Sequence, residues 1–235
     1  MQLTDGVHVA ITDRRGGVSR TPFASRNLGG AVGDIRQAVL TNRDRTAAEL
    51  GFDPTRVVLM NQVHGADTAY VTEPWSHESA PLDGLCTDQP GLVLGVLVAD
   101  CAPVLIADPV AKLVGAAHAG RRGTAVGVVP ALVRTMVDRG GDPARMVALV
   151  GPTVCRLCYE VSAELHAGYP EAGRAVSRRG TPSLDIRAAI VTQLADHGVV
   201  DVRHDDRCTI ESSELYSHRR EQPTGRFAGY IWLAA

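Results

Sequence analysis

The sequence lacks several features that would place a protein in a class at once. Its net charge is only −2, from 24 Lys and Arg against 26 Asp and Glu, which excludes a strongly basic nucleic-acid coat and a highly acidic disordered tail. Aromatic residues make up 4% of the chain, too few for a platform that stacks single-stranded bases. No apolar run approaches the ~20 residues that span a bilayer, and residues 1–6 do not resemble the start of a signal peptide. We therefore expect a cytoplasmic protein that binds neither nucleic acid nor a membrane.

The metal-binding motifs that are recognised by local spacing are also missing. No His-x-His or His-x-x-x-His pair occurs, and the only Cys-x-x-Cys, formed by Cys155 and Cys158, has no second copy. It follows Gly151-Pro152 instead of opening a helix, so we interpret the two residues as reduced cysteines in a loop. The five cysteines are an odd number without a secretory signal, which disfavours a disulfide framework and favours metal or catalytic roles.

What is present indicates an ordinary globular fold. Hydrophobic residues make up 45% and charged residues 21% of 235 residues, and no linker divides the chain, so we predict one domain over residues 1–235. Apolar runs of strand length alternate irregularly with segments of helical period, which favours the α+β class over a regular βαβ repeat. The expected strands are 7–12, 57–60, 68–72, 92–98, 104–107, 113–117, 146–150, 199–202 and 227–232. The expected helices are 35–50 with Asp34 as its N-cap, a helix through 132–137 with Pro130 in its first turn or kinking it, and 186–197.

Three candidate ligands stand next to small residues at the ends of apolar strands. They are His64, Cys101 and His118, separated by 37 and 17 residues, so only the fold can bring them together. Two histidines and one cysteine are the ligand set of an open catalytic zinc, whose fourth position is left for water or substrate. Each residue alone also fits an ordinary structural role, as a small core cysteine or a hydrogen-bonded histidine.

Arginines form a second constellation. Because Lys112 is the only lysine, arginine is the default anion-binding group of this chain. Candidates to hold phosphate or a carboxylate are Arg43, the pair Arg121-Arg122 and the pair Arg219-Arg220, although most arginines are solvated surface residues.

An ordered set of short motifs resembles the laccase-domain family of purine nucleoside phosphorylases, also called peptidoglycan editing factors or multicopper polyphenol oxidases. The motifs are Asn61-Gln62-Val63-His64-Gly65, Asp83-Gly84-Leu85-Cys86-Thr87, Ala99-Asp100-Cys101-Ala102-Pro103-Val104, Ala117-His118-Ala119-Gly120, Cys158-Tyr159-Glu160-Val161, Tyr216-Ser217-His218-Arg219-Arg220 and Gly225-Arg226. The resemblance spans nearly the whole chain, from Gly16-Gly17-Val18-Ser19 to the last strand.

The resemblance implies a fold, a metal and a reaction. The implied fold is a single α+β domain of packed mixed β-sheets flanked by helices. The implied cofactor is Zn²⁺ on His64, Cys101 and His118, with Arg43 and Arg122 as the arginines nearest the site. The implied activities are phosphorolysis of adenosine, inosine and methylthioadenosine and hydrolytic deamination of adenosine. The family usually has Trp where this chain has Arg121, which affects the expected substrate preference more than the fold or the metal.

Three other functions need to be weighed, of which the first is not expected and the other two remain open at this level. A true laccase needs a blue-copper site and a histidine-rich trinuclear cluster, so we expect no laccase activity, and copper would bind only adventitiously at the zinc site. A metal-free cysteine hydrolase would use Cys101 as nucleophile and His118 as base, with a peptidoglycan precursor as one candidate substrate. A non-enzymatic protein would close a structural zinc with a fourth ligand, for which Cys86, Cys155, Cys158 and Cys208 are all available.

Overall fold

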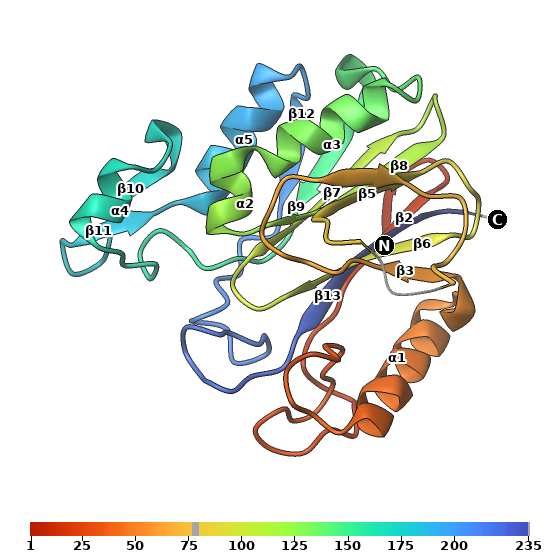
Figure 1. Cartoon of the computed structure of the whole chain (residues 1–235), viewed down its shortest axis with the longest axis horizontal. Coiled ribbons are helices and arrows are strands. Elements are labelled where there is room, and N and C mark those ends of the chain that lie inside the picture. The colour runs from red at the N-terminus through yellow and green to blue at the C-terminus, as the bar shows by residue number, and fades with distance from the viewer. Residues whose placement is uncertain (77–79, 235) are drawn as a thin grey trace.

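The computed structural model describes residues 1–76 and 80–234, and these build two β-sheets that pack face to face (Figure 1). The five-stranded sheet has the order β1-β2-β13-β6-β3, and the six-stranded sheet has the order β12-β9-β7-β8-β5-β4. Both sheets mix parallel and antiparallel pairs, which confirms the predicted α+β class. The strands of the first sheet are β1 Gln2–Thr4, β2 Val7–Ile11, β3 Val57–Leu59, β6 Val93–Val98 and β13 Phe227–Leu233. Those of the second are β4 Thr68–Tyr70, β5 Gly84–Thr87, β7 Ala102–Asp108, β8 Leu113–Ala119, β9 Val147–Val150 and β12 Asp201–His204.

Helices cover the outer faces of the two sheets. α2, α3 and α5 lie over the six-stranded sheet, and α1 lies on the opposite side of the molecule beside the five-stranded sheet (Figure 1). A short hairpin, β10-β11, stands with α4 at one end of the molecule. The helices are α1 Arg36–Leu50, α2 Arg121–Val126, α3 Val128–Val137, α4 Ala163–Ala167 and α5 Ile186–Asp196. Single 3₁₀ turns are η1 Pro54–Arg56, η2 Pro143–Arg145 and η3 Glu171–Gly173. The hairpin strands are β10 Arg174–Val176 and β11 Pro182–Leu184.

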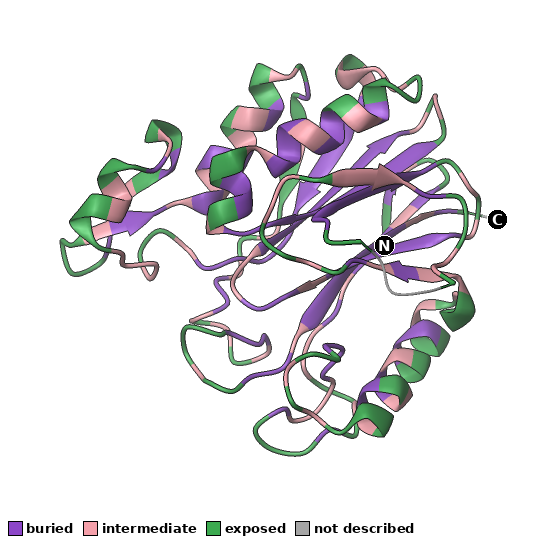
Figure 2. Ribbon diagram, viewed as in Figure 1, coloured by how far each residue is buried: buried purple, intermediate pink, exposed green. Residues whose placement is uncertain are grey.

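The main core lies between the sheets. Strands β7 and β8 are buried along their whole length because one face meets the other sheet and the opposite face meets α3 and α5 (Figure 2). This explains their continuous apolar sequence, since a strand covered on both faces has no solvent side to alternate with. The outer faces of the helices are exposed in the same view.

Local sequence signals set several element ends, and the tertiary structure sets others. Gly51 ends α1 in a left-handed conformation with φ 76°, as a C-terminal glycine should. Asp34 does not cap α1: the N-cap is Ile35, and the Asp34 carboxylate instead accepts hydrogen bonds from Ser19 and Asn27. Strand β12 begins at Asp201, two residues later than predicted, because its register is set by parallel pairing with β9.

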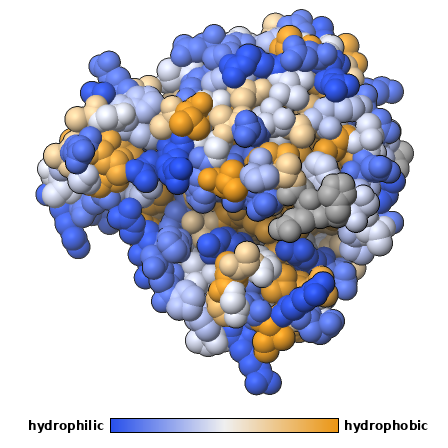
Figure 3. Space-filling model, viewed as in Figure 1, coloured by the Kyte–Doolittle hydropathy of each residue, from blue (hydrophilic) through white to orange (hydrophobic). Residues whose placement is uncertain are grey.

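Within the described part of the chain, no helix combines the length and the apolar character needed to cross a bilayer. The face seen in Figure 3 is mostly hydrophilic, with hydrophobic side chains scattered over it.

Candidate metal centre and adjoining pocket

The hairpin of β7 and β8 brings Cys101 and His118 to the same end of the sheet. Ala102 pairs with Ala119 and Pro103 with His118, so Cys101, just before β7, lies opposite Gly120, just after β8. The separation of 17 residues is therefore what two seven-residue antiparallel strands and a short connection produce. Gly120 leaves room for the thiol at this point, because a Cβ there would come within 2.6 Å of the Cys101 Sγ and would push it out of place.

A buried carboxylate places the third ligand. His64 lies in a turn with a positive φ of 63°, a conformation that a non-glycine residue rarely adopts. Asp83, just before β5, holds this turn by accepting backbone N–H bonds from Val63, His64 and Gly65 at 2.7–3.2 Å. The same carboxylate bonds His118 Nδ1 at 2.7 Å, and the Asp83 carbonyl accepts the His118 backbone N–H at 2.8 Å. Asp83 thus orients both histidines, a role that the sequence motif around it did not reveal.

The three side chains converge closely. The Cys101 Sγ is 3.8 Å from His64 Nε2, and the two imidazole rings meet edge to face with centroids 4.7 Å apart. One ligand atom from each residue lies within 4.8 Å of the others. His118 is buried, Cys101 is partly exposed and His64 is exposed, so the cluster has one open side.

Charge stabilisation in the cluster favours a thiolate. Burial by itself raises the pKa of Cys101, but the charges and hydrogen bonds of His118 and His64 outweigh it and lower this pKa from 9.0 to about 6. Burial by itself lowers the pKa of His118, but the Cys101 thiolate and the Asp83 carboxylate raise it to about 9. Hydrogen bonds from His118 and from the backbone of the His64 turn likewise keep the pKa of Asp83 low despite its burial.

The cluster fits a zinc ion by the chemistry of its donors. Because His118 Nδ1 is engaged by Asp83, Nε2 is the nitrogen left for a metal, and a carboxylate behind a ligating histidine is the usual outer-shell arrangement. Two imidazoles and a thiolate match a catalytic zinc set with a free fourth position. Among the described residues, none of the other four cysteines belongs to this ligand group, which speaks against a closed structural site here.

A strained turn presents Cys101. Asp100 has a positive φ of 87°, and its backbone carbonyl accepts bonds from the Thr153 hydroxyl at 2.6 Å and the Val154 N–H at 3.0 Å. Its side chain accepts from the Thr209 hydroxyl at 2.6 Å and from the Arg219 N–H at 2.7 Å. Segments from the second half of the chain therefore fix the position of the thiol.

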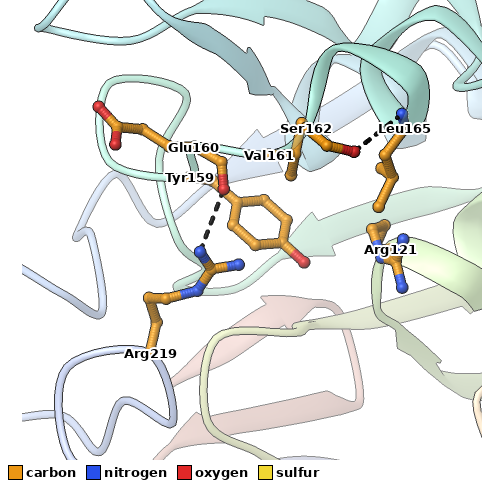
Figure 4. A pocket seen from close by; sticks show the side chains of 7 residues that line it. All are labelled: Arg121, Tyr159, Glu160, Val161, Ser162, Leu165 and Arg219. Atoms are coloured by element: carbon orange, nitrogen blue, oxygen red, sulfur yellow. Dashed lines mark hydrogen bonds between the residues drawn. The ribbon is translucent and has the colours of Figure 1, made fainter.

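An open pocket of about 480 Å³ is lined by two arginines and by Tyr159, which interacts electrostatically with Cys101, although none of the three ligand residues lines the pocket itself. Arg121 begins α2 directly after Gly120, and Arg219 is the residue whose N–H binds Asp100. Between them stands Tyr159, with its ring 5.0 Å from the Arg219 guanidinium and its hydroxyl directed toward Arg121 (Figure 4). The remaining lining residues are Glu160, Val161, Ser162 and Leu165.

Two of the five candidate arginines, Arg121 and Arg219, line this pocket, and the other three lie elsewhere. Arg122 lies exposed in the first turn of α2, while its neighbour Arg121 lines the pocket. Arg43, on α1, donates two hydrogen bonds to the Leu28 carbonyl at 2.8 and 3.0 Å. Arg226, which we did not single out, interacts electrostatically with Cys101, and burial lowers its pKa. Arg220 donates to backbone carbonyls and to Glu221, so its guanidinium is already engaged.

Comparison with known proteins agrees with the motifs. The family model described as multi-copper polyphenol oxidoreductase laccase matches residues 8–234. A purine nucleoside phosphorylase of Streptomyces coelicolor is 52% identical over 97% of this chain and 96% of its own length, and one of Mycobacterium tuberculosis is 45% identical over 94% and 90%. The crystal structure of YlmD from Geobacillus stearothermophilus superposes with a TM-score of 0.92 at 34% identity, covering all of this chain and 94% of that one. The Bacillus licheniformis hypothetical protein YfiH gives 0.90 at 32%, covering 97% and 93%.

Proposed function

The chain belongs to the multi-copper polyphenol oxidoreductase laccase family, and on that premise we propose that it is a zinc-dependent purine nucleoside phosphorylase. Its proposed substrates are adenosine, inosine and methylthioadenosine with phosphate, and its proposed second activity is deamination of adenosine. The observation that carries the proposal is the open His64, Cys101, His118 ligand set together with a pocket of two arginines, whose Tyr159 interacts electrostatically with Cys101.

The proposed roles follow from position and charge. His64, Cys101 and His118 hold the metal, which when bound supplies a Lewis acid with a free coordination position. Arg121 and Arg219 provide the positive charge for a phosphate, because guanidinium groups match phosphate oxygens in pairs. Phosphorolysis forms a bond from a phosphate oxygen to C1′ of the ribose and breaks the bond from C1′ to the purine, so fixed positive charge next to the phosphate positions the nucleophile.

Three further residues complete the proposed substrate site. Tyr159 offers the aromatic surface that the replacement of the family Trp by Arg121 removes. Arg122, by motif, is a further phosphate ligand from the exposed start of α2. Arg43 is also proposed as a substrate-site residue by motif, and its contact with Leu28 supports a role in positioning the loop after Asn27.

The test is a chromatographic assay of adenosine with purified protein and phosphate. In zinc-replete protein we expect adenine and ribose 1-phosphate from phosphorolysis of adenosine, inosine from its deamination, and hypoxanthine from phosphorolysis of that inosine. After chelation we expect none of these products. Both activities should disappear together in Cys101→Ala, since one centre serves two substrate poses. Loss of only one activity would contradict the single centre, and unchanged adenosine in zinc-replete protein would overturn the proposal.

The pocket is tested separately from the centre. Arg121→Ala and Arg219→Ala should raise the KM for phosphate, whereas Arg45→Ala removes the same charge from the exposed side of α1 and should not. A KM for phosphate that responds equally to all three would assign the effect to net charge instead of to the pocket.

We also propose that copper-dependent laccase activity is absent. In the part of the chain that the structure describes, the two side-chain groups able to hold a metal contain two histidines between them. A trinuclear copper cluster needs many more. A copper-loaded sample with the blue absorption of a copper-thiolate site would contradict this expectation.

A cysteine hydrolase is the second candidate, and the thiolate–imidazolium pairing of Cys101 with His118 favours it. This enzyme would act without metal on an amide, with a peptidoglycan precursor as the proposed substrate class. It predicts that alkylation of Cys101 by iodoacetamide abolishes activity and that chelators do not. Retention of activity after complete alkylation would exclude it.

A further inference from the structure

A second group of metal-ligating side chains lies on two turns that the proposed mechanism does not use. Cys155 and Cys158 are three residues apart, and so are Cys208 and Glu211, so the two turns carry the same spacing. One ligand atom from each of the four residues lies within 4.8 Å of every other. None of these residues is a ligand of the first centre.

Each turn is closed so that its two side chains point the same way. The Cys155 carbonyl accepts the N–H groups of Cys158 and Tyr159, both at 3.0 Å, and the Cys208 carbonyl accepts the N–H of Ser212 at 2.8 Å. Arg220 strengthens the second turn by donating to the carbonyls of residues 209, 210 and 212 at 2.8–3.1 Å. Tight turns with ligands at the first and fourth positions are the usual framework of a structural zinc site.

The two turns are already joined without a metal. Thr153 and Cys208 form a parallel bridge, with the Thr209 N–H on the Thr153 carbonyl at 3.2 Å. The Cys155 N–H points at the Cys208 Sγ at 3.3 Å, the kind of contact that supports a sulfur carrying negative charge. Ligand sulfurs around a tetrahedral zinc lie about 3.8 Å apart, from Zn–S bonds of about 2.3 Å, so the group needs to contract by at most ~1 Å.

We propose that Cys155, Cys158, Cys208 and Glu211 form a closed, structural zinc site distinct from the His64, Cys101, His118 centre. Three thiolates select a thiophilic ion, and a carboxylate oxygen completes four-coordination. Binding releases the three thiol protons, which leaves the site with a net charge of −2. Arg178 is placed to offset that charge, since its guanidinium bonds Glu211 at 2.6 Å and interacts with Cys158 and Cys155.

A disulfide accounts for less of the arrangement. It would join two of the three sulfurs and leave the third cysteine and Glu211 without a reason to converge. The metal uses all four groups and ties together the segments that hold Asp100, through Thr153, Val154 and Thr209. The second site would therefore stabilise the wall from which Cys101 is presented.

The test counts metal ions and does not depend on catalytic activity. Zinc-replete protein, analysed by plasma mass spectrometry after gel filtration, should hold two ions per chain. Cys101→Ala should hold one, and Cys101→Ala combined with Cys158→Ser should hold none. Cobalt-loaded Cys101→Ala should show the strong charge-transfer absorption of three thiolates, and the double variant should lose it.

A milder variant guards against a failure to fold. Glu211→Gln keeps the size of the side chain and should weaken zinc binding by at least about tenfold in competition with a chelator. Glu214→Gln changes a partly exposed carboxylate that pairs with Arg15, so it is the matched control and should bind zinc like the natural chain. Cys101→Ala protein that holds no stoichiometric metal, or that contains a disulfide among Cys155, Cys158 and Cys208, would overturn the proposal. A second zinc with an inactive protein would support it while refuting the proposed phosphorylase.

Discussion

The two cysteine clusters of this protein, His64–Cys101–His118 and Cys155–Cys158–Cys208–Glu211, differ in the charge state that they favour for their thiols. In the first, a single thiol faces two imidazoles at the end of a buried hairpin, and the pKa of Cys101 falls to about 6. In the second, three thiols share their space, and burial together with the neighbouring sulfurs raises the pKa values of Cys155 and Cys158. The surroundings of Cys101 stabilise its thiolate. The thiols of the second cluster stay protonated unless a bound cation compensates the negative charges of several thiolates at once. The comparison teaches that the partners of a cysteine decide its chemistry more than its burial does.

The largest expected effect separates the clusters by activity. Cys101→Ala should lower kcat/KM for phosphorolysis by on the order of 10³-fold or more, since it removes a group of the catalytic unit. Cys158→Ser should lower it by about tenfold or less, because its effect reaches the centre only through supporting contacts. Cys86→Ala, a buried cysteine of β5 outside both groups, is the control. Equal losses in the first two variants would erase the distinction between the clusters.

Asp83 should couple stability to metal affinity. Asp83→Asn weakens the carboxylate that serves His118 and three backbone N–H groups, so we expect about 3 kcal/mol less stability and zinc affinity reduced about 10–100-fold. Asp108→Asn is the matched control, because Asp108 is also fully buried and bonded to backbone N–H groups and to Arg145. Urea denaturation should show a lower free energy of unfolding for both variants. Chelator competition should show a lower zinc affinity for Asp83→Asn alone. A lower zinc affinity in both variants would show that the effect of Asp83 on the metal arises only from the loss of stability.

The pH dependence of alkylation should distinguish the thiols in metal-free protein. The lowered pKa of Cys101 means that its thiolate is populated above pH about 6, so its alkylation rate should be half-maximal there, whereas Cys155 and Cys158 stay protonated well above their ordinary range. Mass-spectrometric mapping of iodoacetamide adducts measures both. His118→Ala should move the Cys101 midpoint upward. A midpoint near 9 in the natural chain would show that no ion pair forms.

The same shifts oppose each other in the pH dependence of stability of the metal-free fold. Cys101, with its pKa lowered from 9.0, contributes stability that is fully present above pH 9 and is lost as the pH falls through about 6. His118, with its pKa raised from 6.5, contributes stability that is fully present below pH 6.5 and is lost as the pH rises through about 9. Between pH 6.5 and 9 the first contribution rises while the second falls by a similar amount, so thermal denaturation of chelated protein should show a stability that changes little across this range. His118→Ala removes the partner that lowers the pKa of Cys101, so it should reduce stability at every pH in this range.

The smallest expected effect concerns the link between the clusters. Thr209→Val removes the hydrogen bond from the Thr209 hydroxyl to the Asp100 carboxylate and should lower the free energy of unfolding by about 1 kcal/mol. Thr46→Val, which removes a buried hydroxyl bond within α1, is the control. In a double-mutant cycle with Cys158→Ser, we expect the Thr209 effect on activity to shrink, because the second cluster holds the same segment. Strict additivity would show that the two clusters are independent.

The sequence predicted the parts of the fold that local physics controls. The apolar runs that became β6, β7 and β8, the helical period of α5 and the glycine that ends α1 all carry their signal within a few residues. Helix α2 was not predicted, because its six residues, Arg121–Val126, contain a glycine and show no helical periodicity of apolar residues. The capping role assigned to Asp34 was wrong because more distant partners, Ser19 and Asn27, compete for its carboxylate.

The sequence predicted the three candidate ligands of the first centre, but it did not predict the residue that orients two of them. Residue types and strand ends pointed to His64, Cys101 and His118, and the fold brings them together. Asp83 carried no signal of its own, since an aspartate before a glycine is typical of a turn. The second cluster was interpreted as two loop cysteines, because Cys155 and Cys208 are 53 residues apart and no spacing rule joins a cysteine pair to a distant Cys-x-x-Glu.

The sequence by itself determined the α+β class, the buried strands and the family to which the chain belongs, because composition, periodicity and ordered motifs are properties of the chain. Tertiary structure alone decided which thiol becomes a thiolate, which arginine lines the pocket and which cysteines meet. Those outcomes depend on distances of a few ångströms between residues far apart in sequence. Electrostatic and coordination energies vary steeply over such distances, and local sequence does not set them.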